Sequence, residues 1–383
     1  MKRILIIENV NYIDYPTGGI MNFYRNMMQA FGDELMLAGI STDEETPIGK
    51  WSKKEINGTV YDFYSMARVT ERTKKPIVPE RIKNCIHVKR HIKNILSRGD
   101  FDVIFTHTPE VMLFIPDEYM NITCNCLPGV ENPLSIARYP WARKFAGLYD
   151  RFILMPKATK AKWLIAAADY NDRLAFAERS KGKISVEKVI EFPTRYDDNI
   201  YGVNRIENDN NETVIVTVGR LGWFKGWKLM IDAFKLASKE LNNAKLYFIG
   251  DGEDHDKITT YIQEQGLDGQ VVLLGKKAPK EIAEWLNKAD LFVMGSMAEG
   301  WSTTLVEACA CGVPCVVTDF SSAREMIADG KNGYVITGRD ENMFADKMIE
   351  ALTLDINEVI SYDKRFEQLA VSHLKEDLNK IWS

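Results

Sequence analysis

Two glutamates eight residues apart, Glu299 and Glu307, flank a run of small and hydroxyl-bearing residues in the second half of the chain. Ser302 can cap a helix that begins there, and the free backbone amides in the first turn of such a helix bind anions. Carboxylates accept hydrogen bonds from the neighbouring hydroxyls of a ribose or a hexose. The spacing therefore predicts a nucleotide-sugar pocket. The alternative is structural, because the helix dipole also favours a carboxylate near a helix start.

A second candidate anion site is the stretch TVGRLGWFKGWK at 217–228, which follows a strand-like run and opens a helix. Its glycines permit close approach of the backbone to a ligand, and Arg220 and Lys225 add positive charge where helix amides point outward. This combination suits a diphosphate, although a tight turn with two surface cations would have the same sequence. The glycines do not fit GxGxxG, and no GxxxxGK[ST] loop occurs, which argues against nicotinamide enzymes and P-loop kinases.

The elements that must position these residues are short apolar strands that alternate with helices, a pattern typical of parallel strands covered on both faces. The expected strands of the second half are 213–219, 244–250, 270–275, 290–296 and 314–319, and the expected helices are 226–241, 254–266, 279–289 and 302–312. In the first half we expect strands at 3–10, 101–107 and 121–127, and helices at 16–31 and 81–97. Two successive α/β units predict two Rossmann-like domains, joined through the polar stretch 191–212.

Composition is that of an ordinary globular chain of 383 residues, with 45% apolar and 27% charged residues. No apolar run approaches the roughly 18 residues of a membrane span, and the N-terminus resembles a buried strand more than a signal peptide, so we expect a cytosolic protein. The six cysteines include no CxxC pair and no zinc spacing, which favours buried, reduced thiols. These cysteines are Cys85, Cys124, Cys126, Cys309, Cys311 and Cys315.

Charge is distributed unevenly along the chain. Residues 1–200 hold 29 Lys+Arg against 25 Asp+Glu, whereas residues 201–383 hold 20 against 29. Basic residues cluster at 68–98 and at 138–162, so an anionic surface or substrate is expected near the first half. The helix at 81–98 could rest on anionic lipid headgroups at the inner face of a membrane, or its basic side could simply be solvated. Nucleic acid is not expected, because aromatic residues are not interleaved with these basic ones and the net charge is −5.

The stretch EGWSTTLVEACACGVPCVVTD at 299–319 resembles the E-x7-E motif of retaining glycosyltransferases with the GT-B fold, the glycogen-synthase-like and sucrose-synthase-like group. VGRLGWFKG at 218–226, FIGDGED at 248–254 and YPTGGIMNF at 15–23 resemble further motifs of that group, in the same order. The resemblance implies two Rossmann-like domains that face one another across a cleft. The expected domains are 1–195 for the acceptor and 196–360 for the nucleotide-sugar donor, and a C-terminal helix within 361–383 crosses back to the first domain.

The resemblance also implies roles for individual residues. Arg220 and Lys225 would bind the donor diphosphate and neutralise the leaving group, Glu307 would accept the ribose hydroxyls, and Glu299 would hold the transferred sugar. His107, at the end of a strand, would face the reaction centre, although a lone histidine there is often structural. With His107, Glu299, Arg220 and Lys225 as catalytic residues, the remaining implied donor-binding positions are Gly18, Gly19, Gly275, Lys276, Lys277, Gly300, Ser302, Thr303, Thr304 and Leu305. We expect surface positions for the other histidines, His87, His91, His255 and His373.

For the reaction, the resemblance implies front-face transfer of a hexose-type sugar with retention, from a UDP-sugar or alternatively a GDP-sugar, to a glycan or lipid-linked acceptor in cell-surface polysaccharide synthesis. No metal and no further cofactor are expected. Glu131 is a candidate pocket acid for a double displacement. Gly295 is expected to loosen its turn, and Trp301 and Thr304 to shape the sugar pocket. Two other functions remain open, a nucleotide-sugar epimerase of the same fold and a noncatalytic sugar-nucleotide binding protein.

Overall fold

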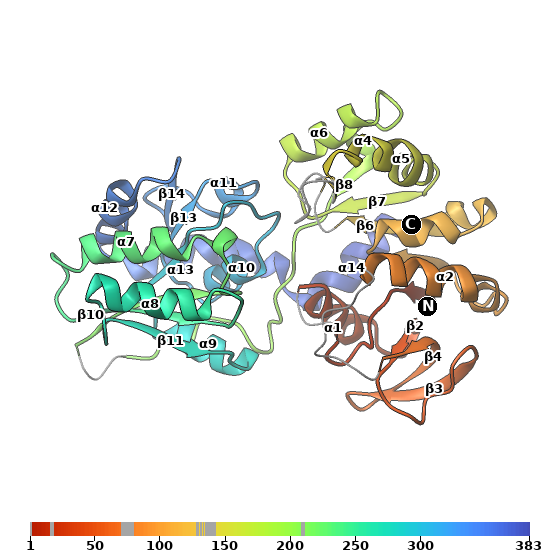
Figure 1. Cartoon of the computed structure of the whole chain (residues 1–383), viewed down its shortest axis with the longest axis horizontal. Coiled ribbons are helices and arrows are strands. Elements are labelled where there is room, and N and C mark those ends of the chain that lie inside the picture. Colours follow the sequence, from red (N-terminus) through yellow and green to blue (C-terminus); the bar gives the residue numbers. More distant parts are fainter. Residues whose placement is uncertain are drawn as a thin grey trace. The chain divides into compact units, whose positions relative to one another are not determined.

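The computed structural model describes residues 2–15, 19–69, 80–127, 130, 132, 134, 143–207 and 211–383. The chain divides into two compact units (Figure 1). The first unit comprises Met1–Pro193 and His373–Ser383, and the second comprises Thr194–Ser372. Each unit is built on one predominantly parallel sheet, so the expected pair of Rossmann-like domains is confirmed. The units divide at 193/194, two residues before the expected boundary.

The first unit contains an eight-stranded sheet in the order β3-β4-β2-β1-β5-β6-β7-β8. Its strands are β1 (Ile4–Ile7), β2 (Leu35–Ser41), β3 (Trp51–Ile56), β4 (Thr59–Arg68), β5 (Val103–Thr106), β6 (Thr123–Leu127), β7 (Trp163–Ala166) and β8 (Val189–Glu191). β3 pairs antiparallel to β4 at one edge, and the other pairs are parallel. β1 lies between β2 and β5, so the chain extends the sheet first on one side of β1 and later on the other.

Helices pack against this sheet, and one of them comes from the end of the chain. They include α1 (Gly19–Phe31), α2 (Glu80–Leu96), α6 (Tyr170–Arg179), α14 (Val371–Trp382), and the consecutive turns α4 (Ala146–Tyr149), η4 (Asp150–Leu154) and α5 (Met155–Ala158). Leu374, Leu378 and Trp382 of α14 recur every four residues and join the buried cluster that contains β1 and β5. The expected return of a C-terminal helix to the first domain is therefore confirmed, and His373–Ser383 group with the first unit.

The second unit contains a six-stranded, wholly parallel sheet in the order β11-β10-β9-β12-β13-β14. Its strands are β9 (Thr213–Val218), β10 (Ala244–Ile249), β11 (Val271–Gly275), β12 (Leu291–Met294), β13 (Cys315–Thr318) and β14 (Gly333–Ile336). Its helices are α7 (Trp227–Ala237), α8 (His255–Gln265), α9 (Pro279–Lys288), α10 (Thr303–Ala310), α11 (Ala323–Met326), α12 (Glu341–Ala351) and α13 (Ile356–Asp363). All nine elements expected in the second half are present.

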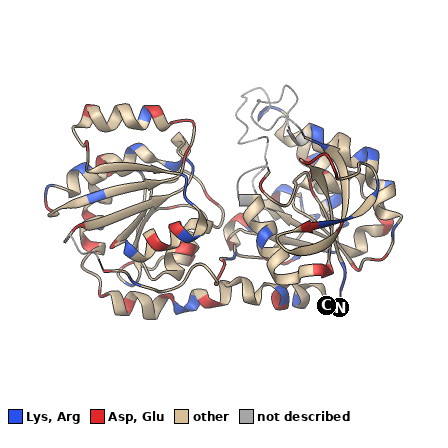
Figure 2. Cartoon of the chain, turned by 90° about the horizontal axis from the view of Figure 1, so that it is seen from below, with Lys and Arg blue, Asp and Glu red and all other residues tan. Residues whose placement is uncertain are grey.

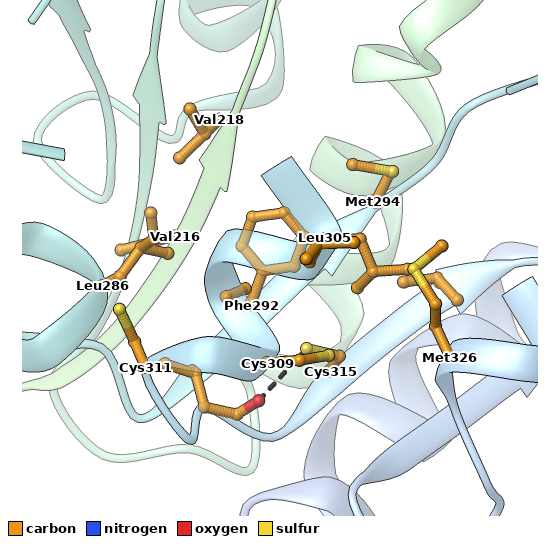
Figure 3. Packing of buried hydrophobic residues seen from close by; sticks show 14 of the residues in the cluster. Val216, Val218, Leu286, Phe292, Met294, Leu305, Cys309, Cys311, Cys315 and Met326 are labelled. Carbon is orange, nitrogen blue, oxygen red and sulfur yellow. Dashed lines mark hydrogen bonds between the residues drawn. The ribbon is translucent and has the colours of Figure 1, made fainter. Parts of the chain in front are cut away.

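Both faces of this sheet are buried, as its apolar strands require. Val216 of β9 packs into one cluster with Phe292 and Leu305, whereas the neighbouring Ile215 packs into a second cluster on the opposite face. Figure 3 shows the first cluster, in which the start of α10 is held against β9 and β12 by Leu305. The six cysteines form no disulfide, and five of them are buried.

Several first-half elements were not predicted from the sequence. β3 has a half-buried, lysine-rich sequence, WSKKEI, which lacks the apolar run used to identify strands. The helix expected at 81–97 exists as α2, on which Ile92 and Ile95 are buried, whereas Ile82 and Ile86 are 51% and 52% exposed. Within the described ranges, no helix has the length and apolarity to cross a membrane.

Candidate active site

The predicted catalytic loops of the second unit meet where its strand order reverses. β9 lies between β10 and β12, and open α/β sheets bind ligands outside the carboxyl ends of the strands at such a point. The loop after β9 carries Lys225, and the loop after β12 carries Glu299. Lys225 Nζ forms an ion pair with Glu299 Oε1, and Ser296 Oγ donates a hydrogen bond to the same oxygen at 2.7 Å. Two residues 74 positions apart in sequence thus share one site.

Glycines bring the backbones of these two loops into contact. Gly226, between the short helix η6 (Trp223–Lys225) and α7, adopts a left-handed conformation with φ of 70°, and a Cβ there would lie 1.7 Å from Gly295 O. The Met297 amide also donates to Phe224 O at 2.8 Å. A Cβ on Gly295 would lie 2.9 Å from Gly226 O, so its missing side chain also allows the two loops to pack closely, and the expected loosening of the turn stays a prediction.

A small cavity lies between the loops. Gly219, Lys225, Met294 and Ser296 are among its lining residues, so its walls combine backbone, one cation and one hydroxyl. Gly250 packs beside it, since a Cβ on Gly250 would lie 1.9 Å from Gly219 O. This site suits an anionic group that accepts hydrogen bonds from backbone amides and from a lysine.

The turn after β11 is connected to this edge through the backbone. Gly250 donates its amide hydrogen to Gly275 O at 2.9 Å. Lys276 is exposed, and Lys277 pairs with Glu281 at 3.3 Å. β11 is the edge strand of the sheet and lies two strands away from β9. These two lysines therefore follow the same carboxyl edge but belong to its periphery.

Arg220 has a partner that the sequence did not suggest. Its Nε donates to Glu253 Oε2 at 2.8 Å, from the turn after β10, and the two side chains are 65% and 47% exposed. An ion pair this exposed contributes little to stability because water screens it. Arg220 can therefore exchange its carboxylate partner for a phosphate. Glu253 lies within the motif FIGDGED, and this position in the sequence could have indicated that Glu253 lies near the site.

The start of α10 has the expected cap. Ser302 Oγ accepts a hydrogen bond from the Leu305 amide at 3.4 Å and lies 3.3 Å from Thr304 Oγ1. Thr303 and Thr304 are half-buried, whereas the Leu305 side chain is fully buried, so Leu305 can contribute only backbone to a ligand. Gly300 O accepts a hydrogen bond from Ser322 Oγ at 2.5 Å. This contact fixes the backbone that precedes α10. The first turn of α10 retains free amides of the kind that bind phosphate.

Glu307 is buried more deeply than a simple diol acceptor would be. It is 7% exposed, and burial raises its pKa to about 8, against a smaller lowering by the hydrogen bond from the Tyr201 hydroxyl. Burial and the neighbouring Glu307 carboxyl raise the pKa of Tyr201 as well. A pKa in this range favours the protonated form of Glu307 at neutral pH. Tyr201 comes from the stretch before β9 and was not predicted as a site residue.

Two predicted site residues of the first unit, His107 and Gly19, lie at its own point of strand reversal, between β1 and β5. His107 directly follows β5 and is 8% exposed. Phe23 and Tyr24 of α1 pack edge-on against its imidazole, with centroids 5.3 and 6.2 Å away. Gly19 is the first residue of α1, whereas Gly18 and Glu131 lie outside the described residues.

Two histidines assigned to the surface are half-buried instead. His91 Nδ1 lies 3.1 Å from the Tyr64 hydroxyl, and burial lowers its pKa. His87 Nδ1 lies 3.1 Å from Asn9 Oδ1, close to the end of β1. Among the residues that the structure describes, no group of three histidine, cysteine or acidic side chains could hold a metal ion.

Known proteins resemble this chain in both sequence and fold. Residues 203–368 match the family described as glycosyl transferases group 1. An uncharacterized glycosyltransferase of Methanocaldococcus jannaschii is 25% identical over 362 residues, which cover 87% of this chain and 84% of that protein. Lipopolysaccharide 1,6-galactosyltransferase of Salmonella typhimurium is 30% identical over 157 residues, covering 40% of this chain and 41% of that one.

Among solved structures, HepE of Anabaena in complex with UDP and glucose superposes with a TM-score of 0.70, at 16% identity and over 99% of both chains. The sequence match and the structural match thus agree on a two-domain glycosyltransferase architecture, the GT-B fold. The similarity to the glycosyl transferases group 1 family lies within the second unit, Thr194–Ser372.

Proposed function

We propose that this protein is a retaining hexosyltransferase that uses a UDP-sugar donor, with a GDP-sugar as the alternative. The observation that carries the proposal is the meeting of Lys225 with Glu299 at the strand reversal of the second sheet. A cation for phosphate and a carboxylate for hydroxyls there match the two halves of a nucleotide sugar. The structural relative HepE, which holds UDP and glucose, supports this choice of donor.

Binding of the donor exchanges partners within this pair. Lys225 and Glu299 neutralise one another, at side-chain exposures of 23% and 16%. A donor diphosphate would take the Lys225 ammonium, and the sugar hydroxyls would donate to the freed Glu299 carboxylate. Arg220 would exchange Glu253 for the second phosphate in the same way. Each half-buried charge keeps an opposite or polar partner, so binding leaves none unpaired.

The transfer step follows from these positions. The bond from the anomeric carbon to the phosphate oxygen breaks as the acceptor oxygen bonds to the same face of that carbon, and the departing phosphate takes the acceptor's proton. Lys225 and Arg220 stabilise the charge that develops on the diphosphate. His107 would contact the sugar or the acceptor from the first domain. Trp301 and Thr304 remain the residues proposed to shape the sugar pocket.

The acceptor is proposed to be a glycan or lipid-linked glycan of the cell surface, in line with the lipopolysaccharide substrate named for the Salmonella relative. Contact with an anionic membrane would bring the enzyme to such an acceptor. Figure 2 shows acidic and basic positions mixed over the first unit, so charge alone does not single out a surface. Exposed apolar residues within the described part of the basic stretch 138–162 identify one candidate membrane-binding surface.

Those residues lie between the N-cap of α4 and η4. Phe145, Leu148 and Phe152 are 49%, 51% and 62% exposed, and the exposed cation Arg151 adjoins them. The acid of this segment, Asp150, pairs with Arg179 at 3.1 Å. Apolar side chains flanked by cations are typical of elements that enter the headgroup layer.

Vesicle co-sedimentation tests the membrane contact. We expect binding to phosphatidylcholine vesicles only when they contain phosphatidylglycerol, and about a tenfold loss when Phe152→Ser removes one exposed aromatic group that the headgroup layer would bury. Val60→Ser is the control, because Val60 is 52% exposed on β4, away from this segment. Equal binding by both variants would contradict the membrane contact and leave the donor site unaffected.

A donor panel tests the proposed function. We expect UDP-glucose, UDP-galactose or UDP-N-acetylglucosamine to raise the melting temperature of the wild-type protein, and Lys225→Ala to abolish that shift. Incubation with the stabilising donor and an acceptor extract then separates the alternatives. Sugar transfer with an α-anomeric product from an α-donor supports retention, whereas isomerised donor indicates an epimerase and binding without turnover a noncatalytic protein. If no nucleotide sugar stabilises the wild type, the proposed pocket is wrong.

A further inference from the structure

The first unit buries a carboxylate that the reaction outlined above does not use. Glu8 directly follows β1, is 2% exposed, and burial raises its pKa. Five donors converge on its two oxygens. They are the Thr108 amide at 2.9 Å, the Thr108 hydroxyl at 2.7 Å, the Asn9 amide at 3.1 Å, the Tyr24 hydroxyl at 3.3 Å and Asn84 Nδ2 at 3.3 Å.

None of these five donors carries a charge. Moving a carboxylate out of water is costly, and neutral hydrogen bonds offset that cost less completely than a cation would. An apolar residue at position 8 would leave all five donors without their acceptor, whereas the carboxylate holds them in one arrangement. The value of Glu8 must therefore lie in the geometry that its hydrogen bonds impose.

That geometry centres on the segment that carries His107. On its C-terminal side, Thr108 donates to Glu8 through both its amide and its hydroxyl. On its N-terminal side, Asn125 of β6 donates to Thr106 O at 3.1 Å and to Thr106 Oγ1 at 2.8 Å. The backbone of His107 is thus fixed at both neighbouring residues.

The imidazole is held by a second connection to the same carboxylate. Tyr24 donates its hydroxyl hydrogen to Glu8 Oε2, and the ring of Tyr24 packs against that of His107. Phe23, the neighbouring residue on α1, contacts the imidazole too. Since α1 begins at Gly19, Glu8 links the helix of the glycine loop to the turn of the histidine.

We propose that Glu8 is a positioning residue for His107, acting through Thr108 on the backbone and through Tyr24 on the ring. This inference rests on the proposed function, in which His107 contacts the sugar or the acceptor. Glu8 follows β1 and His107 follows β5, so the pair occupies the strand reversal of the first sheet as Lys225 and Glu299 occupy that of the second.

Kinetics of UDP-glucose turnover, followed as UDP release, test this role. Glu8→Gln keeps the shape but places an amide among five donors, so we expect kcat to fall between tenfold and about 100-fold with little change in KM, the loss that a small misplacement of a reacting group produces. Glu8→Asp should recover part of the loss. In a His107→Ala background, Glu8→Gln should change kcat less than twofold.

Nuclear magnetic resonance tests the positioning without turnover. The chain has five histidines, and labelling them with ¹³C at Cε1 gives one ring signal each. We expect Glu8→Gln to shift or split the His107 signal while the signals of His255 and His373 stay in place. Thr108→Val, which removes one of the five hydrogen bonds, should shift the His107 signal less and in the same direction. This variant replaces Glu8→Gln in the test if Glu8→Gln does not fold.

Glu34→Gln is the matched control. Glu34 is also buried in the first unit, but it precedes β2 and pairs with Lys375 at 2.7 Å, at the opposite end of the strands. It should leave the His107 signal and kcat unchanged. An unmoved His107 signal in Glu8→Gln, or equal losses of kcat with and without His107, would overturn the inference. If His107→Ala itself turned over UDP-glucose normally, the proposed role of His107 would fail instead.

Discussion

Donor binding should depend on pH through Glu307. This carboxyl has a pKa of about 8 because it is buried, so it must lose a proton before it can accept ribose hydroxyls as a carboxylate. If only the ionised form binds, the dissociation constant is multiplied by one plus the ratio of protonated to ionised carboxyl. That factor is about 30 at pH 6.5 and close to one at pH 9, a difference of about 2 kcal/mol.

Isothermal titration calorimetry with UDP-glucose measures this directly, since its diphosphate has no group that titrates in this range. We expect affinity to rise about thirtyfold from pH 6.5 to pH 9, with about 0.9 proton released per donor at pH 7. The affinity of Glu307→Gln for the donor should not change with pH over this range. Tyr201→Phe removes the hydrogen bond that lowers the Glu307 pKa, so in this variant the rise in donor affinity should occur at a higher pH. A flat wild-type profile, or the same slope in Glu307→Gln, would refute the reasoning.

Three other variants test the site and its frame. Lys225→Ala should lower kcat for UDP-sugar turnover by about 100-fold or more, whereas Lys228→Ala, an exposed lysine three residues on, should change it little; similar losses in both would contradict the proposed contact. Gly226→Ala should lower the melting temperature more than Gly266→Ala, because both have positive φ but only the first Cβ would strike the backbone. Burial raises the pKa of Asp363 to about 8, so the folded chain binds more protons than the unfolded one between about pH 4 and pH 8, and stability falls as pH rises through that window. Urea denaturation at pH 5 and pH 8.5 measures the free energy of unfolding at each pH. The difference between the two values should be smaller for Asp363→Asn than for the wild type, and an equal difference would contradict this assignment.

Sequence reasoning succeeded where burial and local motifs coincide. The strands of the second domain are wholly apolar because helices cover both faces of the sheet, and this makes them conspicuous in the sequence. Ser302 caps α10 through the Leu305 amide, a contact that spans three residues and is therefore predictable from local order. In the first domain, β3 was missed because one of its faces is polar and its strand character comes from pairing with β4.

The sequence by itself indicated the fold class, the resemblance to group 1 glycosyltransferases and the position of the candidate donor-site motifs, because these depend on short patterns and on periodicity. Only the tertiary structure decided the charge states and the partners. Glu8 receives the Thr108 hydrogen bonds from 100 residues away, and the pairing of Lys225 with Glu299 spans 74 residues. Burial, which no local pattern encodes, raises the pKa of Glu307. The residue type of an aspartate or glutamate does not reveal its charge state, which depends on the desolvation and the hydrogen-bond donors that the fold brings to the carboxyl group.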